Sequence, residues 1–145
     1  MINSIKALYS LNKKAKQYRN QSTTKAKNRS KALYELKHNL LLKLKHKMDK
    51  IETHYINNKK YFCFYYDKFS FHVPQEKINT NIQTKTTKVI HEFETDHIPD
   101  KNFYSEKQSL DIIQQQHNIN PNTYLPNNSS FESYWSYLPN EKIIQ

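Results

Sequence analysis

The chain is predicted to have an α+β fold, in which a basic N-terminal helical hairpin packs on a small antiparallel sheet of three to four strands. A C-terminal helix and an aromatic tail follow. Apolar residues recur every three or four positions through the first third, which predicts amphipathic helices. Residues 53–73 are rich in aromatic and β-branched residues interrupted by turn signals, which predicts strands. A length of 145 residues suits a single domain, 1–145, with a modest core.

The hairpin is assigned to residues 1–53. The first helix is predicted from Ser4 to Arg19, and the polar stretch 20–24 supplies Ser and Thr residues that can cap the next helix. The second helix is predicted from an apolar stripe with spacings of three and four: Leu33, Leu36, Leu40, Leu44, Met48, Ile51 and Tyr55. Two such helices need a further layer to bury both apolar stripes.

The sheet is assigned to residues 54–95. Its predicted strands are His54–Ile56, Lys60–Tyr66 and Phe69–Val73, with a possible fourth in 85–95, and its turns are Asn57-Asn58 and Asp67-Lys68. Pro74 is expected to end the third strand, because proline cannot donate to a sheet ladder. In the middle strand, Tyr61, Cys63 and Tyr65 alternate with Phe62, Phe64 and Tyr66, so both faces are expected to be apolar and covered.

Residues 96–145 are expected to hold one helix and an aromatic tail. The helix should begin at Ser105-Glu106-Lys107-Gln108 and end near Asn120-Pro121. The tail is too aromatic for a disordered linker. It is expected to pack on the sheet or to serve as a second contact surface through Tyr134, Trp135 and Tyr137.

The chain contains no glycine, and this absence excludes several classes of enzyme. The Walker A loop, the dinucleotide-binding fingerprint, the nucleophile elbow and the glycine-rich kinase loop all need residues without a Cβ. The only cysteine, Cys63, cannot form an internal disulfide, so nothing indicates an oxidising compartment. With no long apolar run and no secretory signal pattern, the expected location is the cytoplasm.

Positive charge is concentrated at the N-terminal end. Residues 1–50 contain 14 Lys or Arg against two acidic residues, whereas residues 51–145 contain nine against 11. A helix with charges of one sign repels itself, which favours a polyanionic partner over a merely solvated face. The predicted contact residues are Lys27, Arg29, Lys31, Lys37, Lys43, Lys45, Lys47 and Lys50. Because only two of the 23 basic residues are Arg, strong reading of base sequence is not expected.

Three arrangements of residues have the chemistry of a reactive site. His91-Glu92-Phe93-Glu94-Thr95-Asp96-His97 has ligand types that suit zinc or manganese, but a strand would separate them between two faces. Cys63 and His72 could be a thiol and its base, although a buried structural thiol is favoured. Asp67 beside His72 is better explained as a turn residue. The sequence therefore predicts no catalytic residue, no metal and no cofactor.

The basic hairpin followed by YFCFYYDKFSFHVP, residues 61–74, in a small chain with a composition typical of AT-rich coding DNA, resembles small accessory proteins of phages and mobile elements. Anti-CRISPR proteins are among these. The resemblance is one of general character and carries over no individual residue. It implies a non-catalytic inhibitor in the bacterial cytoplasm that binds a host nucleoprotein nuclease, such as a Cas9-type effector, through the Lys-rich helical face.

Two alternatives stay open. The same helices would serve a DNA- or RNA-binding accessory protein of little sequence specificity. A metal-dependent hydrolase or nuclease would instead use His91, Glu92, Asp96 or His97. No membrane partner is expected, and neither the oligomeric state nor the choice between nucleic acid and an acidic protein surface follows from the sequence.

Overall fold

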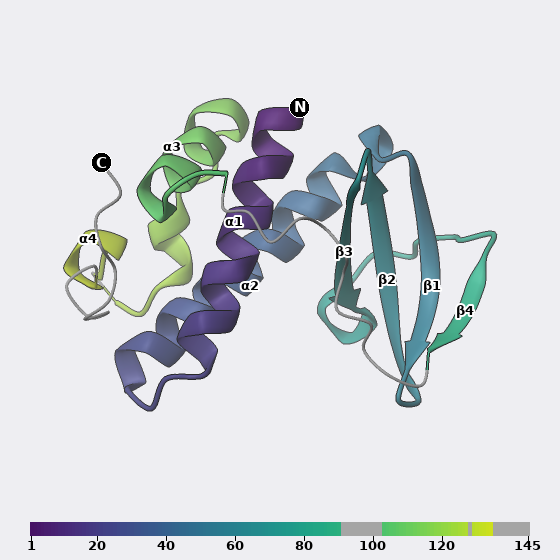
Figure 1. Ribbon diagram of the computed structural model, residues 1–145, viewed down its shortest axis with the longest axis horizontal. Helices are drawn as coiled ribbons and strands as arrows, with labels where there is room; N and C mark the ends of the chain where they lie inside the picture. Colours follow the sequence, from purple (N-terminus) through teal and green to yellow (C-terminus); the bar gives the residue numbers. More distant parts are fainter. Residues whose placement is uncertain (91–102, 128, 135–145) are drawn as a thin grey trace. The chain divides into compact units, whose positions relative to one another are not determined.

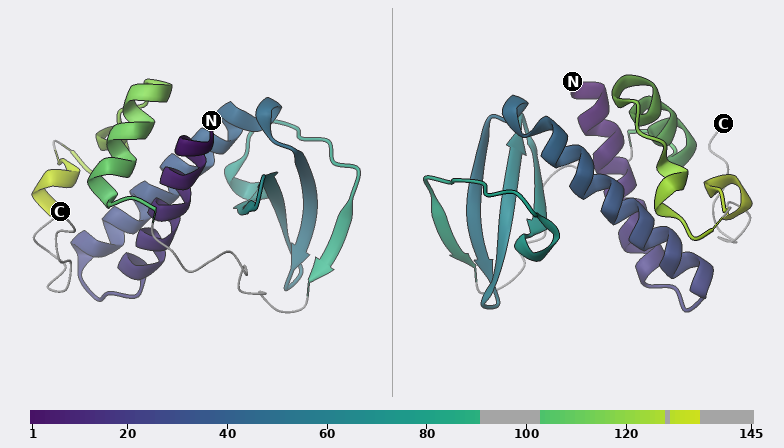
Figure 2. Two further views of the ribbon diagram at one scale, coloured as in Figure 1. Left: turned by 45° about the horizontal axis from the view of Figure 1, so that its top comes forward. Right: turned by 180° about the vertical axis from the view of Figure 1, so that it is seen from behind.

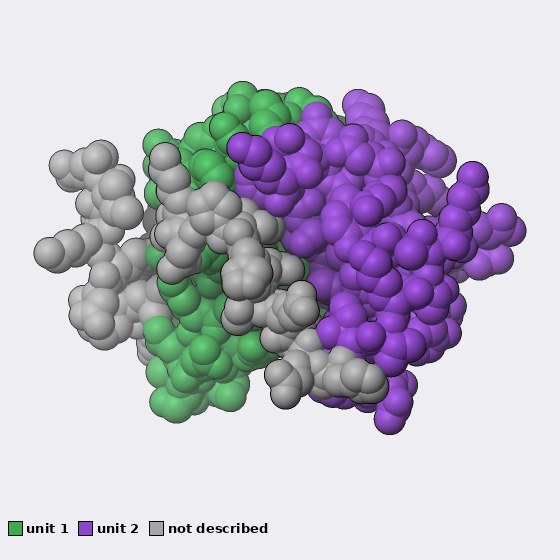
Figure 3. Space-filling model, turned by 45° about the vertical axis from the view of Figure 1, so that its right-hand side comes forward, with its two compact units in different colours: residues 1–37, 101–145 green, residues 38–100 purple. Residues whose placement is uncertain are grey.

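The computed structural model describes residues 1–90, 103–127 and 129–134. It contains helices and one four-stranded sheet (Figure 1), which confirms the predicted α+β class. The chain divides into two compact units, coloured separately in Figure 3. Unit 1 comprises residues 1–37 and 101–145, and unit 2 comprises residues 38–100. The single domain remains a prediction.

Unit 1 is helical. It contains α1 (Ile2–Arg19), the first part of α2 (Thr24–Leu44), α3 (Glu106–His117) and the short α4 (Phe131–Tyr134), shown in Figure 2. The predicted first helix is confirmed, since α1 begins only two residues before its predicted start and ends at Arg19 as predicted. The apolar residues of α1, which recur at spacings of three and four, are almost completely buried: Ile5, Leu8, Leu11, Ala15 and Tyr18.

The turn between α1 and α2 uses the predicted polar residues. Thr23 caps α2, because its side-chain oxygen accepts a hydrogen bond from the backbone N–H of Ala26. Further along, the Ser30 hydroxyl donates to the Ala15 carbonyl at 2.7 Å. A hydroxyl can reach a neighbouring helix backbone in this way only where the two helices approach closely, so α1 and α2 form the predicted hairpin.

Helix α3 has well-defined ends and lies beside α1 (Figures 1 and 2). Ser105 and Gln108 form a reciprocal capping box at its start. At its end Asn118 adopts the left-handed conformation, with φ 52°, that glycine usually supplies. His117 Nε2 lies 2.8 Å from the Ser4 hydroxyl of α1. The predicted C-terminal helix is therefore confirmed, and it is joined to α1 by polar contacts.

Unit 2 contains the C-terminal end of α2 and the sheet. The strands are β1 (Lys50–Ile56), β2 (Lys59–Tyr66), β3 (Phe69–Pro74) and β4 (Thr87–Ile90), in the order β3-β2-β1-β4. The first three are antiparallel, but β4 pairs in parallel with β1. The prediction of an antiparallel sheet is therefore wrong, and the sheet is mixed. Residues 75–86 cross from the β3 edge of the sheet to the opposite edge before β4 begins, which gives β4 the same direction as β1.

The predicted second helix is too long. α2 ends at Leu44, a 3₁₀ turn covers Lys45–Lys47, and β1 begins at Lys50. The error has a simple cause: Ile51 and Tyr55 are four residues apart, which matches one helical turn but also places both on one face of a strand. Residues 51–56 are mostly β-branched or aromatic and pair with β2, so the strand is adopted.

The sheet turns without glycine, as predicted. Asn57 and Asn58 have φ values of 51° and 66° and form the two-residue loop between β1 and β2. Positive φ at both positions is the mark of a type I′ turn, which suits the twist of a hairpin. Asp67, with φ 50°, begins the loop between β2 and β3. Asn and Asp tolerate this conformation better than other residues with a Cβ.

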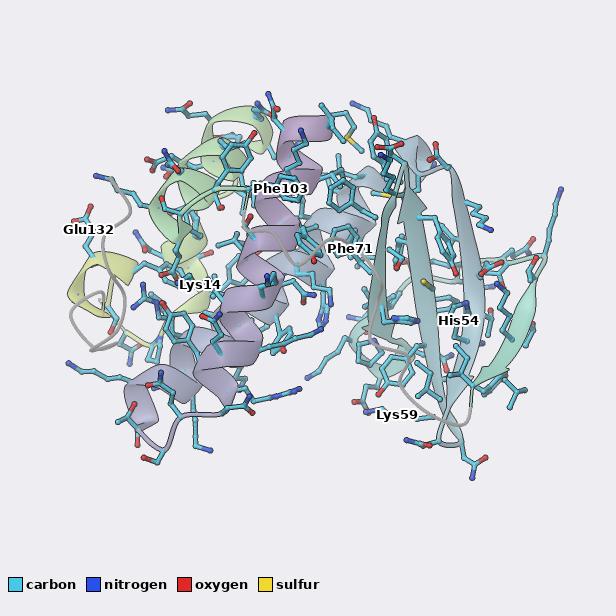
Figure 4. The ribbon with its side chains drawn as sticks, viewed as in Figure 1. Lys14, His54, Lys59, Phe71, Phe103 and Glu132 are labelled. Atoms are coloured by element: carbon cyan, nitrogen blue, oxygen red, sulfur yellow. The ribbon has the colours of Figure 1, made fainter. Side chains whose placement is uncertain are left out.

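The two sheet faces differ in polarity. Phe62, Phe64, Phe69, Phe71 and Val73 are buried on one face. The register places Glu52, Cys63 and His72 side by side on the opposite face, next to His54. Figure 4 labels one residue of each face, Phe71 and His54. The expectation that both faces are apolar is therefore wrong: one face is an apolar core and the other is polar, yet largely buried.

Candidate functional site

The predicted Lys-rich face is only partly exposed. Arg29 and Lys37 are buried, with 1% and 6% of their surface exposed, and this corrects their assignment as contact residues. The others reach solvent: Lys27, Lys31, Lys43, Lys47 and Lys50 are exposed, and Lys45 is half-buried. Lys27 and Lys31 belong to unit 1, and the remaining four belong to unit 2.

Arg29 is buried because it pairs with an acid that is distant in sequence. Its Nε donates to Glu106 Oε1 at 2.8 Å, and Nη2 contacts Oε2 of the same carboxylate. The Tyr18 hydroxyl donates to Glu106 Oε2, also at 2.8 Å. The guanidinium lies over the Tyr18 ring, 4.5 Å from its centroid. This planar pair of hydrogen bonds joins α2 to α3. Arg29 is therefore not available at the surface to contact a partner.

The exposed charge of unit 1 is nevertheless strongly positive. Residues 1–37 contain ten basic residues and only one acid, Glu35. Several of these basic side chains are exposed on α1 and α2: Lys16, Arg19, Lys25, Lys27 and Lys31. We call these five residues the basic surface of unit 1. Three of them were not among the predicted contact residues, although their charge and helical spacing were visible in the sequence.

A second candidate site lies on the polar sheet face. His54 of β1, Cys63 of β2 and His72 of β3 present ligand atoms within 4.8 Å of one another. His54 Nδ1 and His72 Nε2 are 2.8 Å apart. On its other side, the His54 ring has Nε2 3.0 Å from Glu52 Oε1. Figure 4 shows where His54 lies on β1. Two imidazoles, a thiol and a carboxylate therefore converge from three adjacent strands.

The electrostatics of this polar cluster are dominated by Glu52. Burial would raise the pKa of the Glu52 carboxyl, but hydrogen bonds from Tyr65, His54 and Lys88 outweigh it and lower the pKa to about 2. Burial, followed by the hydrogen bond to Glu52, raises the pKa of Tyr65. Lys88 and Lys50 extend over the carboxylate, at 3.3 and 3.6 Å. Glu52 is thus a buried anion held by surrounding donors.

The other candidate reactive residues of the sequence lie in different parts of the chain. Cys63 and His72 are direct partners in the pairing of β2 with β3. Asp67 belongs to the turn, where its backbone N–H donates to the Asp49 carboxylate at 2.7 Å. The cluster at His91–His97 lies outside the described residues. So do Trp135 and Tyr137 and the side chain of Tyr134.

Glu52 was missed because residues 51–53 were assigned to the helical hairpin. His54 was placed at the start of the predicted first strand but was not connected with Cys63 and His72. With β1 starting at Lys50, the polar residues Lys50, Glu52 and His54 occupy every second position. This alternation was the available signal, since it places them on one face of a strand. It became visible only once the helix was known to end at Leu44.

No family model, curated protein or solved structure significantly matches this chain. Among the described residues, no helix is both long and apolar enough to cross a bilayer.

Proposed function

We propose that this chain is a non-catalytic binding protein that contacts a polyanion through the basic surface of unit 1. One observation carries the proposal: five basic side chains are exposed on α1 and α2, and residues 1–37 contain a single acid. Like charges on neighbouring turns of a helix destabilise it by a few tenths of a kcal/mol per pair. A phosphate backbone would relieve this repulsion and release bound counterions.

Burial of Arg29 strengthens the case for contact without base reading. Arg19 is the only other Arg in the chain, and the rest of the basic surface consists of lysines. Lysine binds phosphate as a point charge, whereas arginine makes the two-point contacts that identify guanine. We therefore expect similar affinity for different nucleotide sequences.

The partner that we favour is a host nucleoprotein, such as a CRISPR effector nuclease, which the protein would inhibit by occupying its nucleic-acid path. The support is the small size, the basic charge and the resemblance to phage accessory proteins. A DNA- or RNA-binding accessory role is the alternative, and it rests on the same surface. The two differ in whether the target protein is bound when no nucleic acid is present.

Affinity capture tests the proposal and separates these roles. The full chain would be immobilised and exposed to a low-GC bacterial lysate, with and without nuclease treatment. A Lys16→Glu, Lys27→Glu, Lys31→Glu variant removes charge from the basic surface. A matched control, Lys68→Glu, Lys77→Glu, Lys85→Glu, makes the same change in net charge at exposed positions of unit 2.

We expect the wild type and the control to retain the same nucleic acid or nucleoprotein, and the unit 1 variant to lose it. Capture that survives nuclease treatment indicates a protein-directed inhibitor, and capture that disappears indicates the accessory role. Equal retention by all three proteins would refute the proposed contact surface.

A further inference from the structure

We propose that His54, Cys63 and His72 bind one Zn²⁺ ion and that Glu52 orients His54 as a ligand. The three ligand atoms lie within 4.8 Å of one another and come from three adjacent strands. Imidazole nitrogen and thiolate sulfur are both ligands that Zn²⁺ binds in proteins. This site belongs to unit 2 and is independent of the proposed polyanion contact on unit 1.

The two imidazole nitrogens need little adjustment to bind the ion together. Zinc binds imidazole nitrogen at about 2.0–2.1 Å, so two nitrogens in a tetrahedral site stand about 3.4 Å apart. His54 Nδ1 and His72 Nε2 are 2.8 Å apart. The two rings would therefore separate by about 0.6 Å on binding, a shift that side-chain rotation can supply without moving the strands.

The hydrogen bonds already select the required form of His54. The Glu52 carboxylate lies 3.0 Å from His54 Nε2, so the His54 tautomer with its proton on Nε2 donates a hydrogen bond to it. The Nδ1 lone pair is then directed toward His72. Carboxylate–histidine–zinc arrangements of this kind fix the ligand's tautomer and orientation. When the ion binds, His72 must carry its proton on Nδ1 so that Nε2 is available to the metal.

Charge and burial also suit zinc. The ion carries two positive charges, and the Cys63 thiolate and Glu52 carboxylate together carry two negative charges, so these buried groups balance. Lys50 and Lys88 also contact Glu52, but their side chains are exposed to solvent. This balance of charge lowers the cost of burying the ion. Glu52, His54 and Cys63 are each no more than 3% exposed. Nitrogen and sulfur donors disfavour Mg²⁺ and Ca²⁺, which prefer oxygen.

Burial indicates a structural rather than a catalytic role. The Cys63 thiol is too enclosed to attack a substrate, but as a ligand it would join β2 to β1 and β3. His72 is only half-buried, so its side of the site is the one nearest to solvent. The ion would hold three strands of a small sheet together, much as zinc stabilises other small folds.

Metal analysis of the full chain, purified without a polyhistidine tag, tests the site. We expect about one zinc per chain after dialysis. After exchange for Co²⁺, the spectrum should show a thiolate-to-cobalt charge-transfer band and the strong visible bands of tetrahedral coordination. Chelation should lower the thermal unfolding midpoint. These readouts use the wild type, so they do not depend on whether a variant folds.

Variants assign the ligands. Cys63→Ser and His72→Gln should each weaken zinc affinity at least tenfold, and Cys63→Ser should abolish the charge-transfer band. Glu52→Gln should weaken affinity about tenfold but keep that band. His46→Gln, at an exposed position of the same unit, is the control and should change neither. A zinc-free wild type whose Co²⁺ spectrum shows no thiolate band would overturn the proposal.

Discussion

Arg29 and Glu106 show how one residue pair decides which charges reach the surface. Both side chains are buried, and the carboxylate also accepts the Tyr18 hydroxyl. Nη1 of Arg29 finds no hydrogen-bond partner among the described residues. The pair therefore fixes the contact of α2 with α3 but carries a substantial desolvation cost. The pair therefore specifies how α2 and α3 pack and adds little net stability to the fold.

Breaking this pair from one side should be much more costly than removing both partners. Glu106→Gln leaves Arg29 buried with an uncompensated charge, so we expect the free energy of unfolding to fall by about 3–5 kcal/mol. Urea unfolding followed by far-UV circular dichroism measures the change. The double variant Arg29→Met, Glu106→Leu should recover most of that loss. A double variant no more stable than Glu106→Gln would contradict this account of the pair.

At the scale of elements, the first turn of α2 carries charges that interact unfavourably with the helix dipole. Its first turn contains no acid, and Lys25 and Lys27 are exposed there. Basic residues at a helix N-terminus are unfavourable because the backbone N–H groups already carry partial positive charge. This arrangement is intelligible if the positive charge serves binding.

Lys27→Glu separates stability from binding. We expect the free energy of unfolding to rise by about 0.5 kcal/mol, from the helix dipole and a new pair with Lys31 one turn later. Affinity for a mixed-sequence DNA duplex should fall at the same time. Chemical unfolding and fluorescence anisotropy provide the two values. Lower stability, or unchanged affinity, would be inconsistent with the proposed role of this turn.

The β1–β2 hairpin depends on two asparagines in left-handed conformations. Asn58→Ala should lower the free energy of unfolding by about 1 kcal/mol, because alanine adopts positive φ at a steric cost. Asn58→Gly is the matched variant and should be at least as stable as the wild type. Thermal unfolding would show the difference. Equal midpoints for the alanine and glycine variants would argue against a strained turn.

The elements differed in how well the sequence could predict them. α1, α3 and the Asn57-Asn58 turn were predictable because local signals such as caps, helical spacing and turn residues define them. The end of α2 was not, because Ile51 and Tyr55 satisfy both helical and strand periods. The parallel position of β4 depends on pairing with β1, and no local signal in residues 87–90 specifies it.

At the scale of the whole chain, charge follows the division into units. Unit 1 has 13 basic and five acidic residues, and unit 2 has ten and eight. The N-terminal concentration of charge was evident in the sequence, but the loss of Arg29 and Lys37 to burial was not. Burial of a basic residue depends on a distant partner, as with Glu106. The cluster of His54, Cys63 and His72 likewise required the strand register.

The central claim is that affinity for polyanions resides in the basic surface of unit 1 and not in net charge alone. The most direct measurement is anisotropy with a labelled mixed-sequence duplex, titrated at several salt concentrations. The three proteins are the wild type, the Lys16/Lys27/Lys31→Glu variant and the matched Lys68/Lys77/Lys85→Glu control. Both variants have the same net charge, so long-range attraction is matched as far as total charge can match it.

We predict that the unit 1 variant binds the duplex at least tenfold more weakly than the wild type. The slope of log K against log salt concentration should become less negative by up to about three, as expected when three phosphate contacts are removed. The control should stay within about threefold of the wild type. Equal losses in the two variants, or an unchanged salt dependence in the unit 1 variant, would contradict the account.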